Sequence, residues 1–282
     1  VRTQDILPDT FSEFISYGSY GVTLGDVAYN SHVVSLVNRL YYGFIENQNL
    51  CLPAILDLRE KANFMLFDES ESMRVRNAVN SVIFSSLKNQ PASHQKFILF
   101  DPEGRSQGFA PYLEFMRNNP AVMYNKVFTT QQQIREQVEE LSAFIDEFSQ
   151  TKLADSSDIF AYNRVSVERP ESLKCLCLLN FPKGFDEQML EQLANIVKNG
   201  SSCGVQTVIH FDENAIRNSS STTYIDLLAK IRENCICLQP STTGWYSGNG
   251  INWEFNPQPT QKTMLDFCEL YASKYAEVTS SI

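Results

Sequence analysis

Histidines are few in this sequence, and long apolar runs are absent. The three histidines, His32, His94 and His210, lie far apart, so a catalytic site built around histidine has little support. Only His210 stands near other titratable groups, because Asp212 and Glu213 follow it. No apolar run approaches the roughly 18 to 20 residues that cross a bilayer, and no signal peptide is visible. We therefore expect no direct membrane insertion of this segment.

Basic side chains are outnumbered by acidic ones. Lysine and arginine total 23, aspartate and glutamate total 33, and the formal net charge is -10. Binding of duplex DNA depends on cationic side chains that neutralise phosphates. The composition therefore argues against a surface built mainly for nucleic acid. A net charge does not reveal a local basic patch, so contact with DNA stays open.

The seven cysteines are an odd number, and four of them form two Cys-x-Cys pairs inside apolar runs. In Cys175/Cys177 and in Cys235/Cys237, both thiols lie on one face of a predicted strand. Two such pairs would suffice for a four-thiolate zinc site, but those sites usually use Cys-x-x-Cys on tight turns. We therefore expect buried thiols, no metal, and a protein of a reducing, cytoplasmic compartment.

The chain is long enough for one large α/β domain with appendages or for two smaller domains, with 282 residues of which 43% are hydrophobic. Strands are predicted by five apolar runs, Phe64–Phe67, Lys96–Gly104, Leu173–Phe181, Gly204–Phe211 and Cys235–Leu238, which is expected to be the last strand of the sheet. Helices are predicted over Val75–Leu87, Gln131–Gln150 and Asp186–Asn199, with Gly200 as the closing cap. This alternation predicts a mostly parallel sheet with helices on both faces.

The predicted core spans residues 56–240, and an N-terminal extension of residues 1–55 is expected to pack on it. The chain begins at Val1 rather than at a methionine, so we expect it to be a piece of a longer protein. The extension is predicted to contain a helix over Ser31–Glu46, a strand over Cys51–Leu58, and a short helix running into a strand or hairpin over Thr10–Val22.

The C-terminal part, residues 241–282, is predicted to form a hairpin over Trp245–Phe255 and an amphipathic helix over Thr263–Val278. The helix either packs on its own domain or docks on a neighbour. An interaction surface is one hypothesis for the aromatic residues of the hairpin, and it requires that they form an exposed patch. These residues are Trp245, Tyr246, Trp253 and Phe255.

The stretch Asn63–Leu87 has the pattern of a strand, a polar loop and a helix, which is where P-loop nucleotide hydrolases bind phosphate. Such a loop needs glycines, so that backbone N–H groups can surround the phosphates. It also needs a lysine that reaches the β- and γ-phosphate oxygens, and a serine or threonine that binds magnesium. Here the loop has no glycine and no lysine, and it carries Asp68, Glu69 and Glu71. Each of these like charges opposes nucleotide binding by roughly a kcal/mol or more.

Two interpretations of this loop stay open. It is either an ordinary acidic connection, or Arg74 and Arg76 bind an anion at the start of the helix, such as a neighbour's nucleotide in trans. A second pair of acids, Asp101 and Glu103, follows the carboxyl end of another predicted strand. Because no partner groups accompany them, we do not expect them to be a catalytic acid and base.

Four segments resemble, in the same order, the motor domain of the FtsK/SpoIIIE translocases, and the resemblance runs from Leu56 to Leu238. The first is Asn80, which matches the asparagine after the family's P-loop, and the second is Lys96–Gly104, which matches the family's strand ending in Asp-Pro-Lys-Gly, with Glu103 in place of the lysine. The third is Val127–Thr130 before the Gln131 helix, and the fourth is Tyr162-Asn163, which matches a Tyr-Asn pair that follows this helix in the family. FtsK/SpoIIIE motors are ring-forming, RecA-like P-loop ATPases that move DNA, and relatives drive protein export in type VII secretion. The resemblance therefore implies a RecA-like P-loop NTPase fold.

The positions that would carry hydrolysis depart from the family pattern. The substitutions are Val75 for the P-loop lysine, Arg76 for the serine or threonine, Asn180-Phe181 for the Asp-Glu of the second Walker motif, Ser201 for an arginine that is a candidate charge stabiliser across subunits, and Asp212 for a glutamine at the γ-phosphate. Phenylalanine cannot accept a proton from an attacking water. The resemblance with these losses implies a module that kept the fold and lost hydrolysis.

We therefore expect a structural or regulatory module of a larger DNA or protein translocase, with no cofactor. Its expected partners are other ATPase modules of the same or a related chain, in a ring or homo-oligomer. Two alternatives remain. One is an active, ATP-dependent DNA segregation motor with ATP and magnesium at an atypical site, and the other is a protein-interaction module that reuses the fold.

Overall fold

The structure is a computed structural model, and it describes residues 7–23, 49–60, 62–69, 72–92, 94–104, 107–166, 170–216, 221–242, 244–247 and 251–280. The helix predicted over Ser31–Glu46 lies outside these ranges and stays a prediction. Among the helices of the described ranges, none combines the length and the apolar character that crossing a membrane requires.

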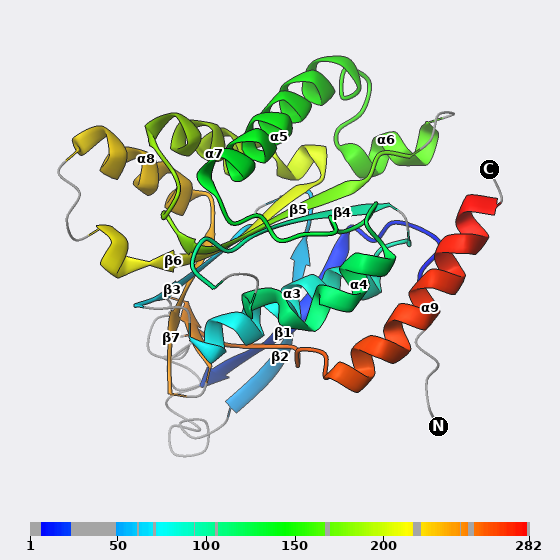
Figure 1. Cartoon of the computed structure of the whole chain (residues 1–282), viewed down its shortest axis with the longest axis horizontal. Helices are drawn as coiled ribbons and strands as arrows, with labels where there is room; N and C mark the ends of the chain where they lie inside the picture. The colour runs from blue at the N-terminus through cyan, green and yellow to red at the C-terminus, as the bar shows by residue number, and fades with distance from the viewer. Residues whose placement is uncertain are drawn as a thin grey trace, which may run out of the picture.

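The described strands form a single nine-stranded sheet in the order β2-β1-β9-β8-β7-β3-β6-β5-β4 (Figure 1). The strands are β1 Phe14–Thr23, β2 Asn49–Asp57, β3 Phe64–Asp68, β4 Gln95–Phe100, β5 Leu173–Phe181, β6 Val205–Asp212, β7 Ile236–Pro240, β8 Trp245–Ser247 and β9 Ile251–Phe255. The five strands of the predicted core, β7-β3-β6-β5-β4, are parallel. The remaining pairings, from β7 through β8, β9 and β1 to β2, are antiparallel.

Helices cover both faces of the parallel strands, which confirms the predicted α/β fold (Figure 1). On one face lie α5, α7 and α8, and on the other lie α3, α4 and α9. The helices are α3 Met73–Asn89, α4 Leu113–Asn118, α5 Gln131–Thr151, α6 Ile159–Val165, α7 Glu187–Asn199, α8 Thr222–Glu233 and α9 Gln261–Ser280, with short 3₁₀ turns η1 Gln107–Tyr112, η2 Ser201–Cys203 and η3 Glu213–Ile216.

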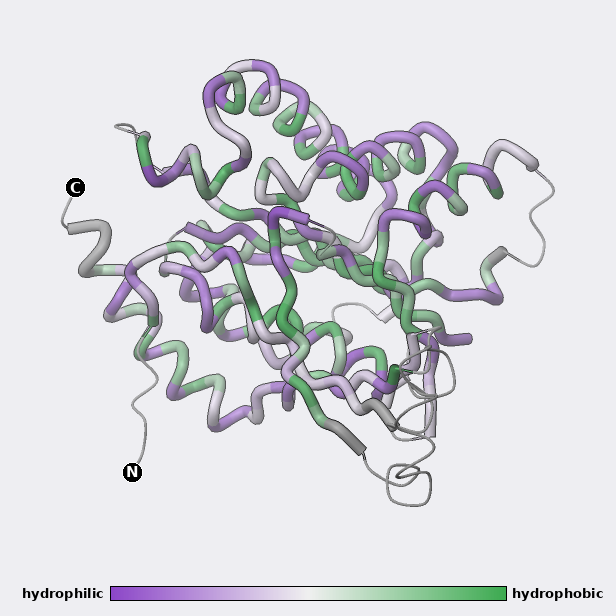
Figure 2. Tube along the Cα trace, turned by 180° about the vertical axis from the view of Figure 1, so that it is seen from behind, coloured by the Kyte–Doolittle hydropathy of each residue, from purple (hydrophilic) through white to green (hydrophobic). Residues whose placement is uncertain are grey.

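The sheet separates two hydrophobic cores. Successive residues of β3 point to opposite faces, so Phe64 and Leu66 join the core under α3, whereas Met65 and Phe67 join the core under α5 and α7. Figure 2 shows the resulting concentration of hydrophobic residues along the strands between the two helix layers. Burial on both faces explains why this strand is a continuous apolar run rather than an alternating one.

The helix boundaries follow from local capping. Thr130 caps the start of α5 through a capping box that it shares with Gln133. Asp186 caps α7 by accepting a hydrogen bond from the N–H of Met189 at 3.1 Å. Gly200 ends the helix in a right-handed backbone conformation, with a φ of -68°. The left-handed turn into β6 is at Gly204 (φ 73°), where a Cβ would lie 2.8 Å from apolar side chains.

Two expectations about the ends of the chain are corrected. Cys235–Leu238 does not contain the last strand of the sheet, because β8 pairs with Gln239 and Pro240 and continues the sheet into β9, β1 and β2. Residues 7–13 form no helix, and the chain enters β1 directly at Phe14. The division into residues 1–55, 56–240 and 241–282 stays a prediction, and all three parts contribute strands to the one sheet.

The aromatic residues of the β8–β9 hairpin are largely core residues. Trp245 is 3% exposed and Trp253 is 2% exposed, whereas Tyr246 is 38% exposed. The ring of Trp253 packs edge-on against Tyr20 at 4.7 Å and against Phe64 at 5.5 Å. The hypothesis of an exposed aromatic surface is therefore wrong for both tryptophans, because Trp245 in β8 lies opposite Trp253 in β9 and both side chains belong to the core under α3.

Candidate functional site

The carboxyl edge of the parallel strands brings together several of the positions singled out in the sequence. Asp68 ends β3 directly opposite Asp212 at the end of β6, and Phe181 ends β5 opposite Phe211. Open α/β sheets bind ligands at this edge. The structure thus gathers the β3, β5 and β6 positions at one candidate site.

Hydrogen bonds join the described residues at the two ends of the connection from β3 to α3. The carboxylate of Asp68 accepts hydrogen bonds from the N–H of Glu69 at 2.8 Å and from the hydroxyl of Ser72 at 2.7 Å. Ser72 in turn caps α3 by accepting the N–H of Val75 at 3.3 Å. A negative group beside a helix N-terminus is stabilised by the helix dipole, and in P-loop proteins that group is a phosphate. Here the carboxylate of Asp68 lies beside that position, bound to the hydroxyl of the N-cap residue Ser72.

Val75 and the two arginines at the start of α3 have different surroundings. Val75, which the resemblance aligns with the P-loop lysine, is fully buried in the core under α3. Arg74 is exposed, and Arg76 is half-buried with its backbone N–H bound to the carbonyl of Ser72 at 3.1 Å. The buried apolar side chain supplies no charge for a phosphate.

The end of β5 carries Asn180 and Phe181, where the resemblance expects the Asp-Glu pair of the second Walker motif. Asn180 adopts a left-handed φ of 56°, a conformation that asparagine tolerates better than most residues, and its N–H donates to Nδ1 of His210 at 3.1 Å. Phe181 is buried and packs against the rings of Phe185 and Phe211 at centroid distances of 5.0 and 6.0 Å. Neither side chain can activate a water.

His210 is buried at the centre of this edge. Because its Nδ1 accepts a hydrogen bond, the neutral ring carries its proton on Nε2, which has no hydrogen-bond partner among the described residues. Burial lowers the pKa of His210, since it disfavours the charged ring, while the carboxylates of Asp212, Asp68 and Glu103 act in the opposite direction. The ring is therefore held neutral as an acceptor for the Asn180 turn.

This burial predicts a loss of stability in mild acid. As the pH falls below the unfolded value of about 6.5, the unfolded state gains a proton that the folded ring resists, so the free energy of unfolding should decrease until the lowered folded pKa is reached. Urea unfolding at about pH 7.5 and about pH 5.5 measures this difference. His210→Asn, which keeps an acceptor for Asn180 but does not titrate, should reduce the difference, and an unchanged difference would contradict the assignment.

The acids after β4 are structural. The buried carboxylate of Asp101 accepts the N–H of Gly104 at 2.6 Å and the N–H of Gly108 at 3.4 Å, and a Cβ at position 104 would collide with it. Glu103 forms an ion pair with Lys183 in the loop after β5. These contacts give both acids a role in holding the loops at the carboxyl edge.

Two further predicted positions lie away from this cluster. Ser201 begins η2, just before β6, and therefore lies at the opposite, amino edge of the parallel strands. Asn80 is buried in α3, where its amide donates to the carbonyl of Gly108 at 3.1 Å. The structure thus does not bring Ser201 to the candidate site of its own chain.

The two Cys-x-Cys pairs do not meet. The sulfurs of Cys175 and Cys177 are 3.7 Å apart and buried on the α3 side of β5, whereas Cys235 belongs to the core on the other side and two strands separate β7 from β5. In the parts of the chain that the structure describes, no three histidine, cysteine or acidic side chains are grouped for a metal ion.

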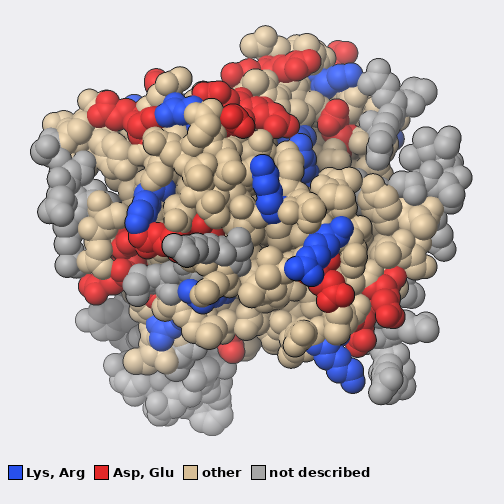
Figure 3. All heavy atoms as spheres, viewed as in Figure 1, with Lys and Arg blue, Asp and Glu red and all other residues tan. Residues whose placement is uncertain are grey.

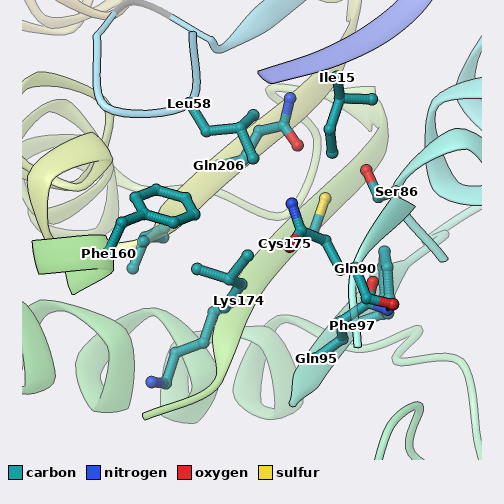
Figure 4. Close-up of a pocket in the computed structure, with 13 residues that line it drawn as sticks. Ile15, Leu58, Ser86, Gln90, Gln95, Phe97, Phe160, Lys174, Cys175 and Gln206 are labelled. Carbon is teal, nitrogen blue, oxygen red and sulfur yellow. Dashed lines mark hydrogen bonds between the residues drawn. The ribbon is translucent and has the colours of Figure 1, made fainter. Parts of the chain in front are cut away.

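A small cavity lies at the amino edge, between the start of the parallel strands and the N-terminal residues (Figure 4). Its volume of about 30 Å³ has room for about two water molecules. Gln206, which lines it, accepts the hydroxyl of Tyr17 at 3.1 Å and donates to the carbonyl of Ala62 at 2.7 Å. The cavity is too small for a substrate, and this polar lining is already hydrogen-bonded.

Lys174 also lines this cavity, but its ammonium group points towards Phe144 of α5. The Nζ lies 3.3 Å from the centroid of the Phe144 ring and donates to the carbonyl of Ser172 at 3.2 Å. Burial lowers the pKa of Lys174 to about 8, and nearby Glu171 opposes that shift. The residue thus stabilises the packing of β5 against α5.

Comparison with known proteins supports the fold. No protein-family model and no curated protein sequence matches the chain. Among solved structures, EssC (ATPases 2 and 3) from Geobacillus thermodenitrificans is similar, with a TM-score of 0.62 and 12% identity over 98% of this chain and 52% of the chain in that structure. The cytoplasmic domain of the type VII secretion ATPase EccC from Thermomonospora curvata has a TM-score of 0.59 and 13% identity over 82% of this chain and 29% of EccC.

The pCW3 conjugation coupling protein TcpA is also similar, with a TM-score of 0.51 and 11% identity over 94% of this chain and 75% of TcpA. These neighbours are FtsK/SpoIIIE-type ATPase domains, so the resemblance predicted from the sequence is confirmed for the fold. The chain spans about half the length of the EssC structure.

Proposed function

We propose that this chain is a non-catalytic, FtsK/SpoIIIE-like module with a structural or regulatory role in a larger translocase. One observation carries the proposal: the carboxylate of Asp68 lies beside the N-cap of α3, where it accepts hydrogen bonds from the N–H of Glu69 and the hydroxyl of Ser72. A nucleotide would have to place its phosphates beside this charge, with buried Val75 in the position of the P-loop lysine. Both effects oppose phosphate binding.

The end of β5 supports the same conclusion. A hydrolase needs a carboxylate there to order magnesium and another to activate water. This chain has Asn180, whose N–H is taken by His210, and the buried ring of Phe181. With neither group present, the module lacks the means to cleave a bound nucleotide.

The proposed partners are other ATPase modules, in the same chain or in a ring or homo-oligomer, in the cytoplasm. The similar EssC structure contains two ATPases, which supports a setting of adjoining modules. The similar structures include a secretion ATPase and a conjugation coupling protein, so the proposal covers translocases of protein and of DNA. On the face shown in Figure 3, acidic side chains gather over the upper helices and basic ones are dispersed, which gives no support to a broad DNA-binding surface on that face.

Calorimetry with ATP and magnesium at concentrations up to millimolar tests the proposal. The wild-type chain should release no binding heat. Asp68→Asn keeps the acceptor oxygen and removes the charge, so it should raise the affinity for inorganic pyrophosphate by about fivefold or more, whereas Glu213→Gln at the same edge should not.

Saturable binding of ATP by the wild-type chain would overturn the proposal and favour the alternative of an atypical nucleotide site. Exposed Arg74 at the start of α3 is the observation that favours this alternative. In that case Arg74→Ala should weaken ATP binding, and the rate of phosphate release would distinguish an active motor from a module that only binds nucleotide.

A further inference from the structure

Residues 7–13 form a strap at the amino edge of the sheet that joins no strand. They lie in neither a helix nor a strand, and α9 runs beside them, where Nζ of Lys274 pairs with Asp9 at 2.7 Å (Figure 1). Within the described ranges, one backbone–backbone hydrogen bond holds the strap, from the N–H of Leu58 to the carbonyl of Glu13 at 2.8 Å. Side chains of other elements therefore make most of its polar contacts.

A side-chain amide holds the backbone of the strap. Oε1 of Gln90, the C-cap residue of α3, accepts a hydrogen bond from the N–H of Ser12 at 3.1 Å. Nε2 of the same amide donates to the carbonyl of Ser12 at 2.6 Å. Every residue other than proline offers this pair of backbone groups. The amide therefore recognises a polypeptide backbone rather than a particular side chain.

Two apolar side chains anchor the strap. Leu7 is 3% exposed and belongs to the core under α3. The ring of Phe11 lies 5.5 Å from the ring of His94 and packs edge-on against Phe160 of α6 at 6.5 Å. Phe160 and Gln90 also line the small cavity at the amino edge, so the strap is bound beside it (Figure 4). Edge-on packing of rings favours an aromatic residue at this place.

The strap is acidic, and the side chains that pair with it are basic. The carboxylate of Glu13 pairs with Arg59 at 2.7 Å and with Arg164 of α6, and the carboxylate of Asp9 pairs with Lys274. The strap itself contains no lysine and no arginine. These pairs are partly exposed, so salt screens them. Three cations from three different parts of the chain thus select a segment of negative charge.

We propose that the strap is detachable, and that its site binds the strap of a second copy of this chain when its own strap is released. The site takes an acidic segment with an aromatic residue, and residues 7–13 of another copy supply the same groups. Because the strap pairs with no strand of the sheet, its release is a local opening that leaves the strand pairing intact. The inference goes beyond the proposed function and does not depend on it, since no part of it uses the carboxyl edge.

Fluorescence anisotropy of a labelled peptide tests binding in trans. The acetylated peptide has the sequence of residues 7–13, Leu-Pro-Asp-Thr-Phe-Ser-Glu, and carries fluorescein beyond a glycine spacer at its carboxyl end. The full chain with Leu7→Ala and Phe11→Ala has lost both apolar anchors of its strap. This double variant should bind the peptide at least tenfold more tightly than the wild type, whose own strap competes at a high effective concentration. Thr10→Ala, at an exposed position of the same strap, should bind it as weakly as the wild type does.

Two further peptides separate the contacts. Alanine in place of the phenylalanine, or lysine in place of both acids, should each weaken binding to the double variant by about tenfold or more. Adding Arg164→Glu to the double variant should reduce its preference for the acidic peptide over the lysine peptide. No binding to the double variant, equal binding by the double variant and the wild type, or equal affinity for all three peptides would overturn the proposal.

Hydrogen exchange of the double variant tests whether the opening is local. The amides of residues 7–13 should exchange at least tenfold faster than in the wild type, whereas those of β5 should exchange at the wild-type rate. Equal acceleration in the strap and in β5 would mean that the strap is an integral part of the fold, and this result would contradict a detachable strap.

Discussion

Replacing Trp253 by alanine should lower the free energy of unfolding by about 3 to 5 kcal/mol. The side chain is 2% exposed and packs edge-on against Tyr20 and Phe64, so its removal leaves a cavity between β1, β3 and β9. Neighbouring backbone cannot close such a cavity easily, because these strands are paired on both sides within the sheet. Urea unfolding measures the change.

Tyr246→Ala is the matched control on the same hairpin. Tyr246 is 38% exposed, so its replacement should cost no more than about 1 kcal/mol. If the two replacements cost the same, the hairpin does not belong to the core. A large loss at Trp253 with a small one at Tyr246 would instead establish that the C-terminal aromatic residues mainly hold the antiparallel strands in place.

Asn63→Ala should lower the free energy of unfolding by about 3 kcal/mol or more, although it removes only a small polar side chain. The amide of Asn63 donates to the carbonyl of Val197 at 2.8 Å, and its oxygen accepts the N–H and the hydroxyl of Thr207 at 2.9 and 3.1 Å. Asn63 is 1% exposed, so water does not replace these bonds when the amide is removed. Each polar group left buried without a partner costs about 1 to 3 kcal/mol.

Asn199→Ala, at the exposed end of α7, is the comparison for this variant. Among the described residues, the amide of Asn199 donates only to the side chain of Asn195, at 2.6 Å, so its loss should stay within about 0.5 kcal/mol. Equal losses in the two variants would mean that Asn63 does not join β3, β6 and α7. Urea unfolding measures both variants. A loss in the free energy of unfolding that is several-fold larger for Asn63→Ala would show that the hydrogen bonds of Asn63 stabilise the amino edge of the sheet.

The individual elements of the core were predictable because their signals are local. Leu173–Phe181 is a mostly apolar run, and the strand there has the predicted bounds. The α5 helix begins at Gln131 after Thr130, since a side-chain cap and an apolar stripe act within one helix. Ser72, which caps α3, had the same kind of signal, because a serine just before a helical pattern marks an N-terminus.

The contacts that define the candidate site were less predictable. The acids of the β3–α3 loop were recognisable, but their sequence does not tell that the Asp68 carboxylate bends back onto Ser72. The bond from Asn180 to His210 joins the ends of two strands that are distant in the chain.

The sequence by itself predicted the five parallel strands, the helices α3, α5 and α7, and the substitutions on which the proposal of a non-catalytic module rests. These properties follow from the spacing of apolar residues and from the identity of single side chains. The tertiary structure alone decided that β1 pairs with β9, that both tryptophans are buried, and that Ser201 lies at the edge opposite Asp68. The reason is physical: burial and pairing depend on contacts between residues far apart in the chain, and local periodicity carries no information about which partner a strand selects.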